Sequence, residues 1–511
     1  MLAKMMSYGL IGIDGIPITV EIDIARGAQT VDTVGLPDNA VKESRERIRS
    51  AILNSGYEFP QMHVLVNLAP ADIKKEGTVY DLPIALGILA AKGAFPAMAA
   101  EDCVIVGELA LDGSVRSVTG VLPMVIDAHD RGFRKFMIPA ANADEASFFG
   151  DIDIYPVKNL IEACRHFKGS CPIAPHPQLD WSGHKTHYAY DFSEIKGQQA
   201  AKRAAEIACA GNHNLLLIGS PGSGKTMLAR SIPSILPEIT MEESLEITRI
   251  HSVAGELKGR GIITERPFRA PHHSASIPSL VGGGARALPG EISLAHYGVL
   301  FMDEFPLFPP SVLDALRQPL EDGTVTITRA AAKTTYPAEI MLVAAMNPCP
   351  CGNYGSKTKE CRCSPLQIER YRNRISSPLL DRLDIHIEMN EVDYKDLTDR
   401  APGESSASIR ERVLAARLRQ KERYRDEGVL FNSQLSTAQL RKYCRMAPDA
   451  EELLHTAYDR LKLSARGYTR IIKVSRSIAD LDGSDKIEKK HVLEAVQFRG
   501  LDEKYWGSSR G

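Results

Sequence analysis

The chain has 511 residues and a formal net charge of −2, with 62 Lys and Arg against 64 Asp and Glu. This length exceeds what one hydrophobic core supports and predicts about three domains. The balanced charge excludes a uniformly basic nucleic-acid binder, but not a local basic surface. No apolar stretch approaches the roughly 20 residues that span a bilayer, and no basic-then-apolar leader is present. We therefore expect a cytoplasmic protein without a membrane partner.

The first 170 residues alternate short β-rich runs with helical runs, which is typical of an α+β domain. The β-rich runs cover residues 17–24, 62–68 and 103–106, and the helical runs cover 39–54 and 81–91. Residues 171–190 are rich in Pro, His, Ser and Gly, so we expect an exposed linker there. The complete chain is predicted to be a multidomain α/β protein.

Strands and helices alternate again over residues 191–398, around a glycine-rich turn that follows the apolar run 215–218. The turn consists of Gly219, Ser220, Pro221, Gly222, Ser223, Gly224, Lys225 and Thr226. Its backbone N–H groups can surround a phosphate, Lys225 can reach the β- and γ-phosphate oxygens, and the Thr226 hydroxyl can bind Mg²⁺. The pattern predicts an ATPase core on a mostly parallel sheet.

Two further apolar strands should end at the same edge of this sheet. The run 299–302 ends in Asp303 and Glu304, so we expect Asp303 to hold Mg²⁺ and Glu304 to deprotonate the attacking water. The run 340–345 is followed by Asn347, which is a candidate to hydrogen-bond that water or the γ-phosphate. A turn-forming Asn before Pro348 is the alternative for this position.

Three arginines are candidates for stabilising charge on the phosphates. Arg382 and Arg374 compete for the role of an arginine supplied to a neighbouring subunit's γ-phosphate, which would require a ring. A surface ion pair is the structural alternative. Arg466 is expected to open a helix that faces the nucleotide of its own chain, as a second sensor, with an ordinary arginine at a helix N-terminus as the alternative.

Four cysteines crowd into fifteen residues, as the pairs Cys349 and Cys351 and Cys361 and Cys363. Four thiolates suit one tetrahedral Zn²⁺, and they leave no open position for catalysis. We expect a structural zinc site, with unmetallated thiols as the alternative.

Two insertions are longer than ordinary connections. Residues 260–289 contain His272 and His273, for which a loop-anchoring role is favoured over metal binding. Residues 321–336 are predicted to form a β-hairpin arm, on which Arg329 and Lys333 could contact nucleic-acid phosphates in a pore. A solvated hairpin tip is an equal alternative.

Residues 399–511 are predicted to form a helical lid. The helical periodicity covers residues 409–427, 437–444, 449–461, 468–482 and 489–499.

The order of these motifs resembles the AAA+ ATPases of the magnesium-chelatase and MCM branch. Three longer stretches narrow the resemblance to the bacterial YifB/ComM family of magnesium-chelatase-like proteins: residues 191–198, 267–273 and 289–296. The resemblance implies a hexameric ring and an ATP-driven helicase that migrates DNA branches during recombination of transforming DNA. It does not imply magnesium insertion into a porphyrin, because that reaction needs separate partner subunits.

The first 170 residues resemble the fold shared by the Lon protease domain and ribosomal protein S5. Val79 stands where Lon has its serine nucleophile and Pro123 where it has its lysine, so no Ser–Lys proteolysis is expected. Candidate phosphate contacts on this domain are Lys42, Arg45, Arg49, Lys74 and Lys75, although a solvated basic face is the simpler interpretation for most of them.

The leading hypothesis is thus a ring-forming ATPase that moves along single-stranded or branched DNA. An ATP-dependent remodeller or chaperone of a protein or metallocofactor partner is the alternative.

Overall fold

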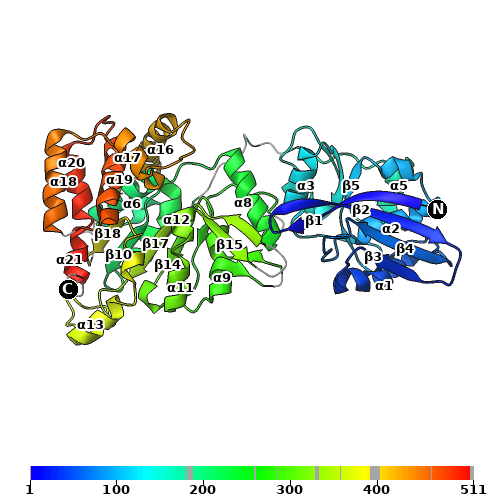
Figure 1. The fold of residues 1–511 in the computed structure, drawn as a ribbon, viewed down its shortest axis with the longest axis horizontal. Helices are drawn as coiled ribbons and strands as arrows, with labels where there is room; N and C mark the ends of the chain where they lie inside the picture. The colour runs from blue at the N-terminus through cyan, green and yellow to red at the C-terminus, as the bar shows by residue number, and fades with distance from the viewer. Residues whose placement is uncertain are drawn as a thin grey trace.

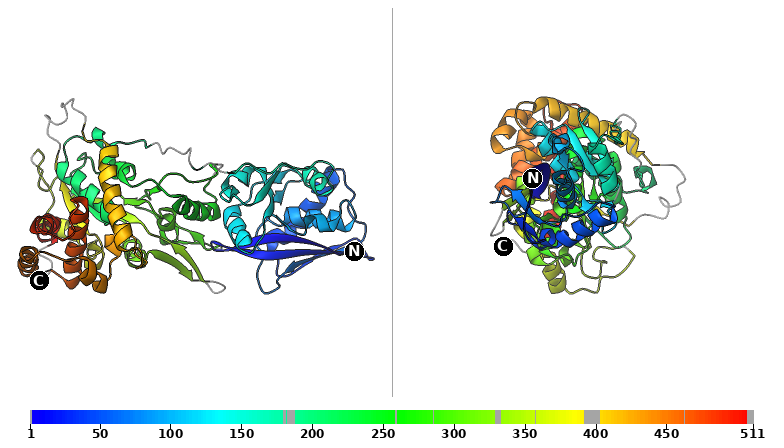
Figure 2. Two further views of the ribbon diagram at one scale, coloured as in Figure 1. Left: turned by 90° about the horizontal axis from the view of Figure 1, so that it is seen from above. Right: turned by 90° about the vertical axis from the view of Figure 1, so that its right-hand side faces the viewer.

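The structure is a computed structural model that describes residues 2–178, 181, 188–257, 260–284, 286–328, 333–356, 358–391, 403–461 and 463–506. The molecule is elongated (Figure 1). The N-terminal part lies at one end, a five-stranded sheet with its helices lies in the middle, and the C-terminal helices lie at the other end. The left-hand view in Figure 2 shows the same order along the long axis.

The N-terminal part contains a seven-stranded sheet of order β3-β4-β2-β1-β5-β8-β9. Its centre is a long antiparallel hairpin of β1 (Leu2–Ile11) and β2 (Asp14–Ala25), and β4 (His63–Ala69) is antiparallel to β2. The other strands are β3 (Val31–Val34), β5 (Cys103–Ile105), β8 (Lys135–Pro139) and β9 (Asp153–Val157), and a separate two-stranded sheet joins β6 (Glu108–Leu109) and β7 (Val115–Arg116). The helices are α1 (Asn39–Asn54), α2 (Asp81–Ala91), α3 (Val121–Asp130), α4 (Ala143–Ala146) and α5 (Leu160–Phe167). All eleven residues of α2 are buried, which explains why its sequence is apolar on every side.

The central sheet has the order β11-β14-β17-β10-β18, and all its strands are parallel. They are β10 (Leu215–Gly219), β11 (Phe268–Arg269), β14 (Val299–Met302), β17 (Met341–Met346) and β18 (Ile385–Met389). The residues of β10, β14 and β17 are all buried, as expected for strands covered on both faces. Because all five carboxyl ends meet at one edge, the chain segments that follow them are brought together there.

Helices and short strands surround this sheet. The helices are α6 (Gln199–Gly211), α7 (Lys225–Ser231), α8 (Met241–Ala254), α9 (Ile277–Val281), α10 (Glu291–Leu294), α11 (Pro310–Ala315), α12 (Pro319–Asp322), α13 (Pro365–Arg372) and α14 (Ser377–Leu380). One small hairpin joins β12 (Gly282–Gly283) to β13 (Leu288–Pro289), and the predicted arm is the hairpin of β15 (Thr324–Thr328) and β16 (Lys333–Pro337). The arm begins later than expected, because Glu321 and Asp322 close the short helix α12.

The C-terminal part is helical, with helices close to the predicted segments. They are α16 (Ser406–Arg423), α17 (Thr437–Tyr443), α18 (Pro448–Arg460), α19 (Ala465–Leu481), α20 (Lys489–Gln497) and α21 (Gly500–Trp506).

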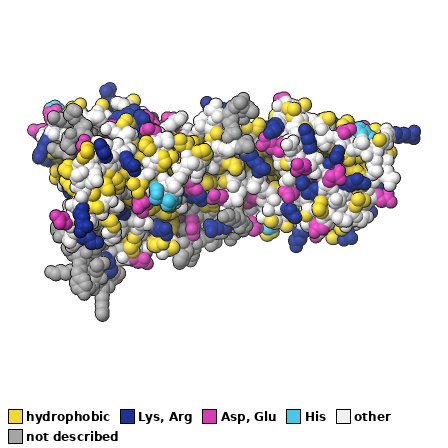
Figure 3. Space-filling model, turned by 90° about the horizontal axis from the view of Figure 1, so that it is seen from below, with side chains coloured by type: hydrophobic (Ala, Val, Ile, Leu, Met, Phe, Trp, Pro, Cys, Tyr) yellow, Lys and Arg dark blue, Asp and Glu magenta, His cyan; other side chains and the backbone are white. Residues whose placement is uncertain are grey.

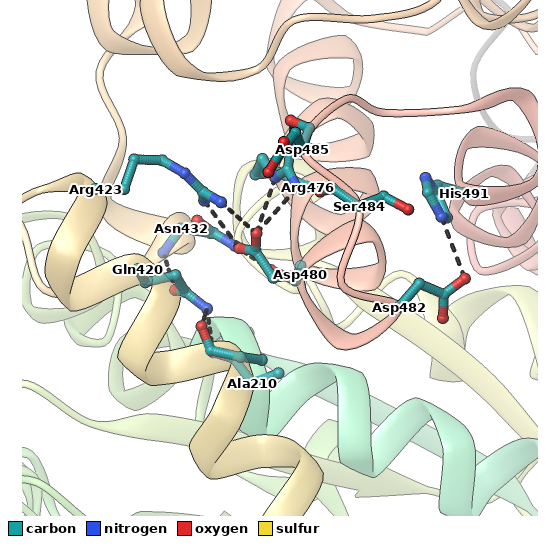
Figure 4. A network of polar contacts seen from close by, with 12 residues as sticks. Ala210, Gln420, Arg423, Asn432, Arg476, Asp480, Asp482, Ser484, Asp485 and His491 are labelled. Carbon is teal, nitrogen blue, oxygen red and sulfur yellow. Dashed lines mark hydrogen bonds and ion pairs between the residues drawn. The ribbon is translucent and has the colours of Figure 1, made fainter.

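A buried polar network joins these helices around Asp480 (Figure 4). Arg423 donates to both Asp480 oxygens, at 2.5 and 3.0 Å, and Asn432 donates at 2.9 Å. Arg476 adds a third donor side chain, at 3.0 and 3.2 Å, and it has no exposed surface. A charge is tolerated in this position because every lone pair of the carboxylate has a donor.

The N-terminal part contacts the central part through α8 and through the hairpin arm, where Gly12 lies against the side chain of Thr334. Arg249 of α8 donates to Asp14 at 2.7 Å and to the carbonyl of Ile13 at 2.9 Å. Ser252 donates to the buried Glu145 carboxylate at 2.5 Å. The tip of the β1–β2 hairpin therefore lies against helix α8 of the central part.

Candidate nucleotide site

The predicted phosphate loop lies between β10 and α7. Gly222 and Gly224 have φ values of 84° and 93°, a conformation that side chains disfavour and that turns successive N–H groups toward one concavity. A Cβ at Gly222 would meet no atom within 4 Å, so the space above the loop is open. The loop thus has the geometry of an anion cradle at the start of a helix.

Lys225 is buried at the base of the loop. Its Nζ donates to the carbonyls of Gly219 and Ser220, at 2.6 and 3.0 Å, and to Oδ1 of Asn347 at 3.2 Å. Burial lowers the pKa of Lys225, and the nearby Asp303 opposes that shift. The structure therefore brings the predicted loop lysine and the predicted sensor Asn347 together.

The metal-binding candidates also meet. Thr226 Oγ1 donates to Oδ2 of Asp303 at 3.1 Å, and the other Asp303 oxygen accepts the N–H of Glu304 at 2.8 Å. One hydroxyl and one carboxylate in direct contact form the oxygen donor set that Mg²⁺ prefers. Thr226 and Asp303 fit a cation that would neutralise phosphate charge.

Glu304 has a left-handed backbone conformation, with φ of 51°. Its Oε2 lies 3.2 Å from Nδ1 of His273, which belongs to the loop after β11. The His272 ring packs on the His273 ring, with 4.1 Å between the centroids. The sequence identified both histidines only as loop anchors, and the contact with the expected general base is a finding of the structure.

Two other residues support the site and were not assigned a role from the sequence. Gln198 Nε2 donates to the carbonyl of Ser223 at 3.1 Å and to that of Asn390 at 2.6 Å, which links the phosphate loop to the end of β18. The hydroxyl of the buried Tyr371 accepts the N–H of Asn347. No local sequence signal marks these two residues, because their partners are distant in the chain.

The candidate arginines lie at opposite ends of the parallel strands: Arg374 at the carboxyl ends and Arg382 at the amino ends. Arg374 Nη1 donates to the carbonyl of Pro306 at 3.3 Å, close to Glu304. Arg382 precedes β18 at the opposite edge, where Asn214 donates to the Arg382 carbonyl at 3.0 Å. The length of β10, about 13 Å at 3.3 Å per residue, separates that edge from the phosphate loop.

Arg466 also lies at this far edge, which corrects the expectation that it faces the nucleotide of its own chain. Its Nη2 is 3.6 Å from Glu321, and the same carboxylate is paired with Arg382. The Arg382 hydrogen bond lowers the pKa of Glu321. The correction has a simple cause: helix α19 packs beside the residues that precede β18, so its first turn faces away from the phosphate loop.

The four cysteines form one cluster, with their sulfurs within 4.8 Å of one another. Cys349 Sγ lies 3.4 Å from that of Cys351 and 3.7 Å from that of Cys361, and Cys351 and Cys361 are also 3.7 Å apart. Zn–S bonds of about 2.3 Å in a tetrahedron separate the sulfurs by about 3.8 Å, whereas a disulfide requires about 2.05 Å. The spacing fits four ligands of one metal ion.

Of the two predicted DNA contacts on the hairpin arm, Lys333 is exposed and Arg329 lies outside the described residues. In the N-terminal part, Lys42, Arg45, Arg49 and Lys74 are exposed, but Lys75 is buried, with its Nζ donating to the carbonyl of Pro70. Lys75 is therefore removed from the list of phosphate contacts. On the face drawn in Figure 3, the coloured Lys and Arg side chains are interspersed with Asp and Glu.

The phosphate loop, the acidic pair and the parallel sheet place the chain among the AAA+ P-loop ATPases. Family models agree: magnesium chelatase subunit ChlI matches residues 191–397, and its C-terminal model matches 403–499. A further model of subunit ChlI matches residues 20–142.

Relatives cover nearly the whole chain. It is 44% identical over 494 residues to the YifB protein of Escherichia coli, covering 96% of each, and 43% identical over 507 residues to the competence protein ComM of Haemophilus influenzae, covering 98% of each. A magnesium-chelatase 67 kDa subunit of Chlorobaculum tepidum is 26% identical over 162 residues, which are 31% of this chain and 23% of that protein. The chain belongs to the YifB/ComM family of magnesium-chelatase-like AAA+ proteins, and this membership implies ATPase activity. Among the described helices, none has the length and apolarity needed to cross a membrane.

Proposed function

We propose that this protein is an ATP hydrolase that works as a hexameric ring in the cytoplasm and couples hydrolysis to movement along DNA. The proposal rests mainly on the position of Arg382 and Arg466. Both lie about one strand length from the phosphate loop of their own chain, and both pair with the Glu321 carboxylate. In a ring, that edge can face a neighbour's phosphate loop. Arg382, rather than Arg374, is then the arginine supplied in trans, and Arg466 accompanies it.

Within one active site, residues 219–226 hold the phosphates and Lys225 contacts their β- and γ-oxygens. Thr226 and Asp303 would hold Mg²⁺, which neutralises phosphate charge when bound. Glu304 accepts a proton from the attacking water, and Asn347 orients that water or the γ-phosphate. The neighbour's Arg382 stabilises the negative charge of the transition state at the γ-phosphate.

The proposed division of labour follows the chain. Residues 1–170 form a non-catalytic domain of Lon-protease/S5 type; Val79 and Pro123 are both buried and offer neither a nucleophile nor a base. Residues 171–190 are the linker, 191–398 the ATPase core with its cysteine insertion, and 399–511 the lid. The four cysteines hold a structural Zn²⁺.

The DNA part of the proposal is supported by the 98% coverage of a protein named for competence and by the hairpin arm, on which Lys333 is exposed. We propose branch migration in recombination of transforming DNA as the process. Lys333 and Arg329 on the arm would contact phosphates without sequence specificity.

The decisive experiment measures steady-state ATP hydrolysis without DNA and with single-stranded DNA, duplex and a four-way junction, over a range of salt concentrations. We expect salt-sensitive stimulation that is largest with branched or single-stranded DNA. A hydrolysis rate that no DNA changes would instead favour a remodeller of a protein partner. Glu304→Gln should bind ATP without turnover, and parental turnover in this variant would refute the assigned base.

A matched pair of lysines tests the arm. Lys333→Ala should weaken DNA binding uniformly across sequences and reduce the salt slope by about one. Lys489→Ala, at an exposed position on the lid, should leave DNA binding unchanged.

A further inference from the structure

The cysteine insertion packs against the phosphate loop at Gly352. Gly352, which lies between the two cysteine pairs, has φ of 81°, and a Cβ at this position would be 2.6 Å from Cδ of Pro221. Pro221 is at the exposed crest of the loop that surrounds the phosphates. The backbone of the cysteine insertion therefore lies directly against the ring of Pro221, with no room for an intervening side chain.

A second connection runs through Asn347. This residue precedes Cys349 by two positions, and its Oδ1 accepts from Lys225 Nζ at 3.2 Å. The same hypothetical Cβ on Gly352 would also lie 3.9 Å from Cγ of Asn347. The cluster thus adjoins both the crest of the loop and the side chain that contacts the loop lysine.

The cysteine insertion is held by polar contacts rather than by regular secondary structure. The segment 349–364 contains no helix or strand among its described residues, and Cys351 is exposed. Ser356 and Thr358 both donate to the Glu391 carboxylate, at 2.6 and 2.8 Å, so the cysteine cluster is the main link between the part before Tyr354 and the second cysteine pair. Its internal order depends on turns, such as the Gly352 N–H donating to the Cys349 carbonyl at 3.0 Å, and on the Tyr354 N–H donating to Cys349 Sγ at 3.3 Å. Immediately before the segment, the Pro348 carbonyl accepts from Arg372 at 3.0 and 3.1 Å, which anchors the start of the segment.

We infer that Zn²⁺ bound by Cys349, Cys351, Cys361 and Cys363 is thermodynamically linked to nucleotide binding, because the metal fixes the insertion that supports Pro221 and Asn347. Without the metal, the insertion loses the cross-link between its two cysteine pairs, and Pro221 of the phosphate loop loses its packing against Gly352. Linkage is reciprocal, so bound nucleotide must also retain the metal. The inference rests on the proposed ATP and zinc sites, but it requires neither hydrolysis, DNA nor a ring.

The test uses the purified full-length chain. Zinc content is measured by mass spectrometry, and zinc affinity is measured by equilibrium competition with a zinc-selective chromogenic chelator, with and without saturating ADP and Mg²⁺. We expect one zinc per chain and a zinc affinity that rises about tenfold with the nucleotide, which is the protection by ADP. The affinity of a fluorescent ADP analogue should fall about tenfold when Cys361 and Cys363 are both replaced by Ser, because the coupling acts equally on both affinities.

Three variants make the result specific. Lys225→Ala should keep zinc but abolish protection by ADP, because it weakens nucleotide binding itself. Pro221→Ala should keep zinc and lose most of the protection, because the contact with Gly352 is removed. Cys171→Ser, which changes an exposed cysteine outside the cluster, should match the parent in every measurement.

Absence of zinc in the purified chain would overturn the inference, and so would a zinc affinity that ADP leaves unchanged while ADP binds. Protection retained in full by Pro221→Ala would overturn the proposed route. Failure of DNA to stimulate hydrolysis would contradict the proposed motor while leaving these binding results standing.

Discussion

His273 Nδ1 lies 3.2 Å from Oε2 of Glu304, so the loop after β11 contacts the carboxylate that follows β14. The two strands are neighbours in the sheet, with Arg269 paired to Leu300 in register. This register brings residues 31 positions apart in the chain to one place. Glu304 has a strained left-handed backbone and a half-exposed side chain, and His273 contacts its carboxylate.

Replacing His273 by Ala should lower kcat for ATP hydrolysis about tenfold or more and leave KM nearly unchanged, because Glu304 loses its orientation while the phosphate loop stays intact. His273→Asn, which keeps a polar contact, should recover part of the rate. His272→Ala is the matched control, since its Nδ1 contacts Ser274 Oγ at 2.8 Å rather than Glu304. Parental kcat in His273→Ala would contradict the positioning role.

Arg382→Ala should reduce hydrolysis by about a thousandfold, because the neighbour's γ-phosphate loses its cation. Mixing this variant with Glu304→Gln should restore part of the activity, since some interfaces then combine an intact Glu304 with an intact Arg382. Arg466→Ala should behave in the same way when mixed with Glu304→Gln. Absence of rescue in both mixtures would count against completion of the site between subunits.

Asp480→Ala should destabilise the lid by about 3–5 kcal/mol, because it leaves the partly buried Arg423 and the buried Arg476 without their shared partner. Urea unfolding followed by far-ultraviolet circular dichroism measures the loss. Asp459→Ala removes an exposed carboxylate of α18 and should change stability by less than about 0.5 kcal/mol. Equal stabilities of the two variants would refute the role of the network.

The lowered pKa of Asp384 predicts how its contribution to the free energy of unfolding depends on pH. Its burial would raise its pKa, but the Arg470 charge and His213 hold the pKa well below its usual range. A carboxylate with a lowered folded-state pKa stabilises the fold above its unfolded pKa, near 3.9, and loses that contribution as the pH falls toward the folded value. The stability difference between the parent and Asp384→Asn, measured by urea unfolding, should therefore be largest near neutral pH and shrink below about pH 4. A difference that is constant with pH would contradict this assignment.

Much of the site could be predicted from the sequence because its chemistry is contiguous. Residues 219–226 form one turn, and Asp303 and Glu304 are adjacent, so their types and order carry the signal. Helices α1 and α2 begin and end at the predicted residues, since their apolar content and turn residues are local. The cysteine pairs could be recognised for the same reason: the members of each pair are two positions apart, and the sulfurs of Cys349 and Cys351 are 3.4 Å apart.

Sequence alone therefore determined which residues form the phosphate loop, the acidic pair and the thiol cluster, because short-range geometry constrains residues a few positions apart. Only the tertiary structure decided that Arg466 lies at the edge of the sheet away from its own phosphate loop, that His273 contacts Glu304, and that Gly352 packs on Pro221. These relationships depend on strand order and helix packing, which join segments that local propensity treats as independent.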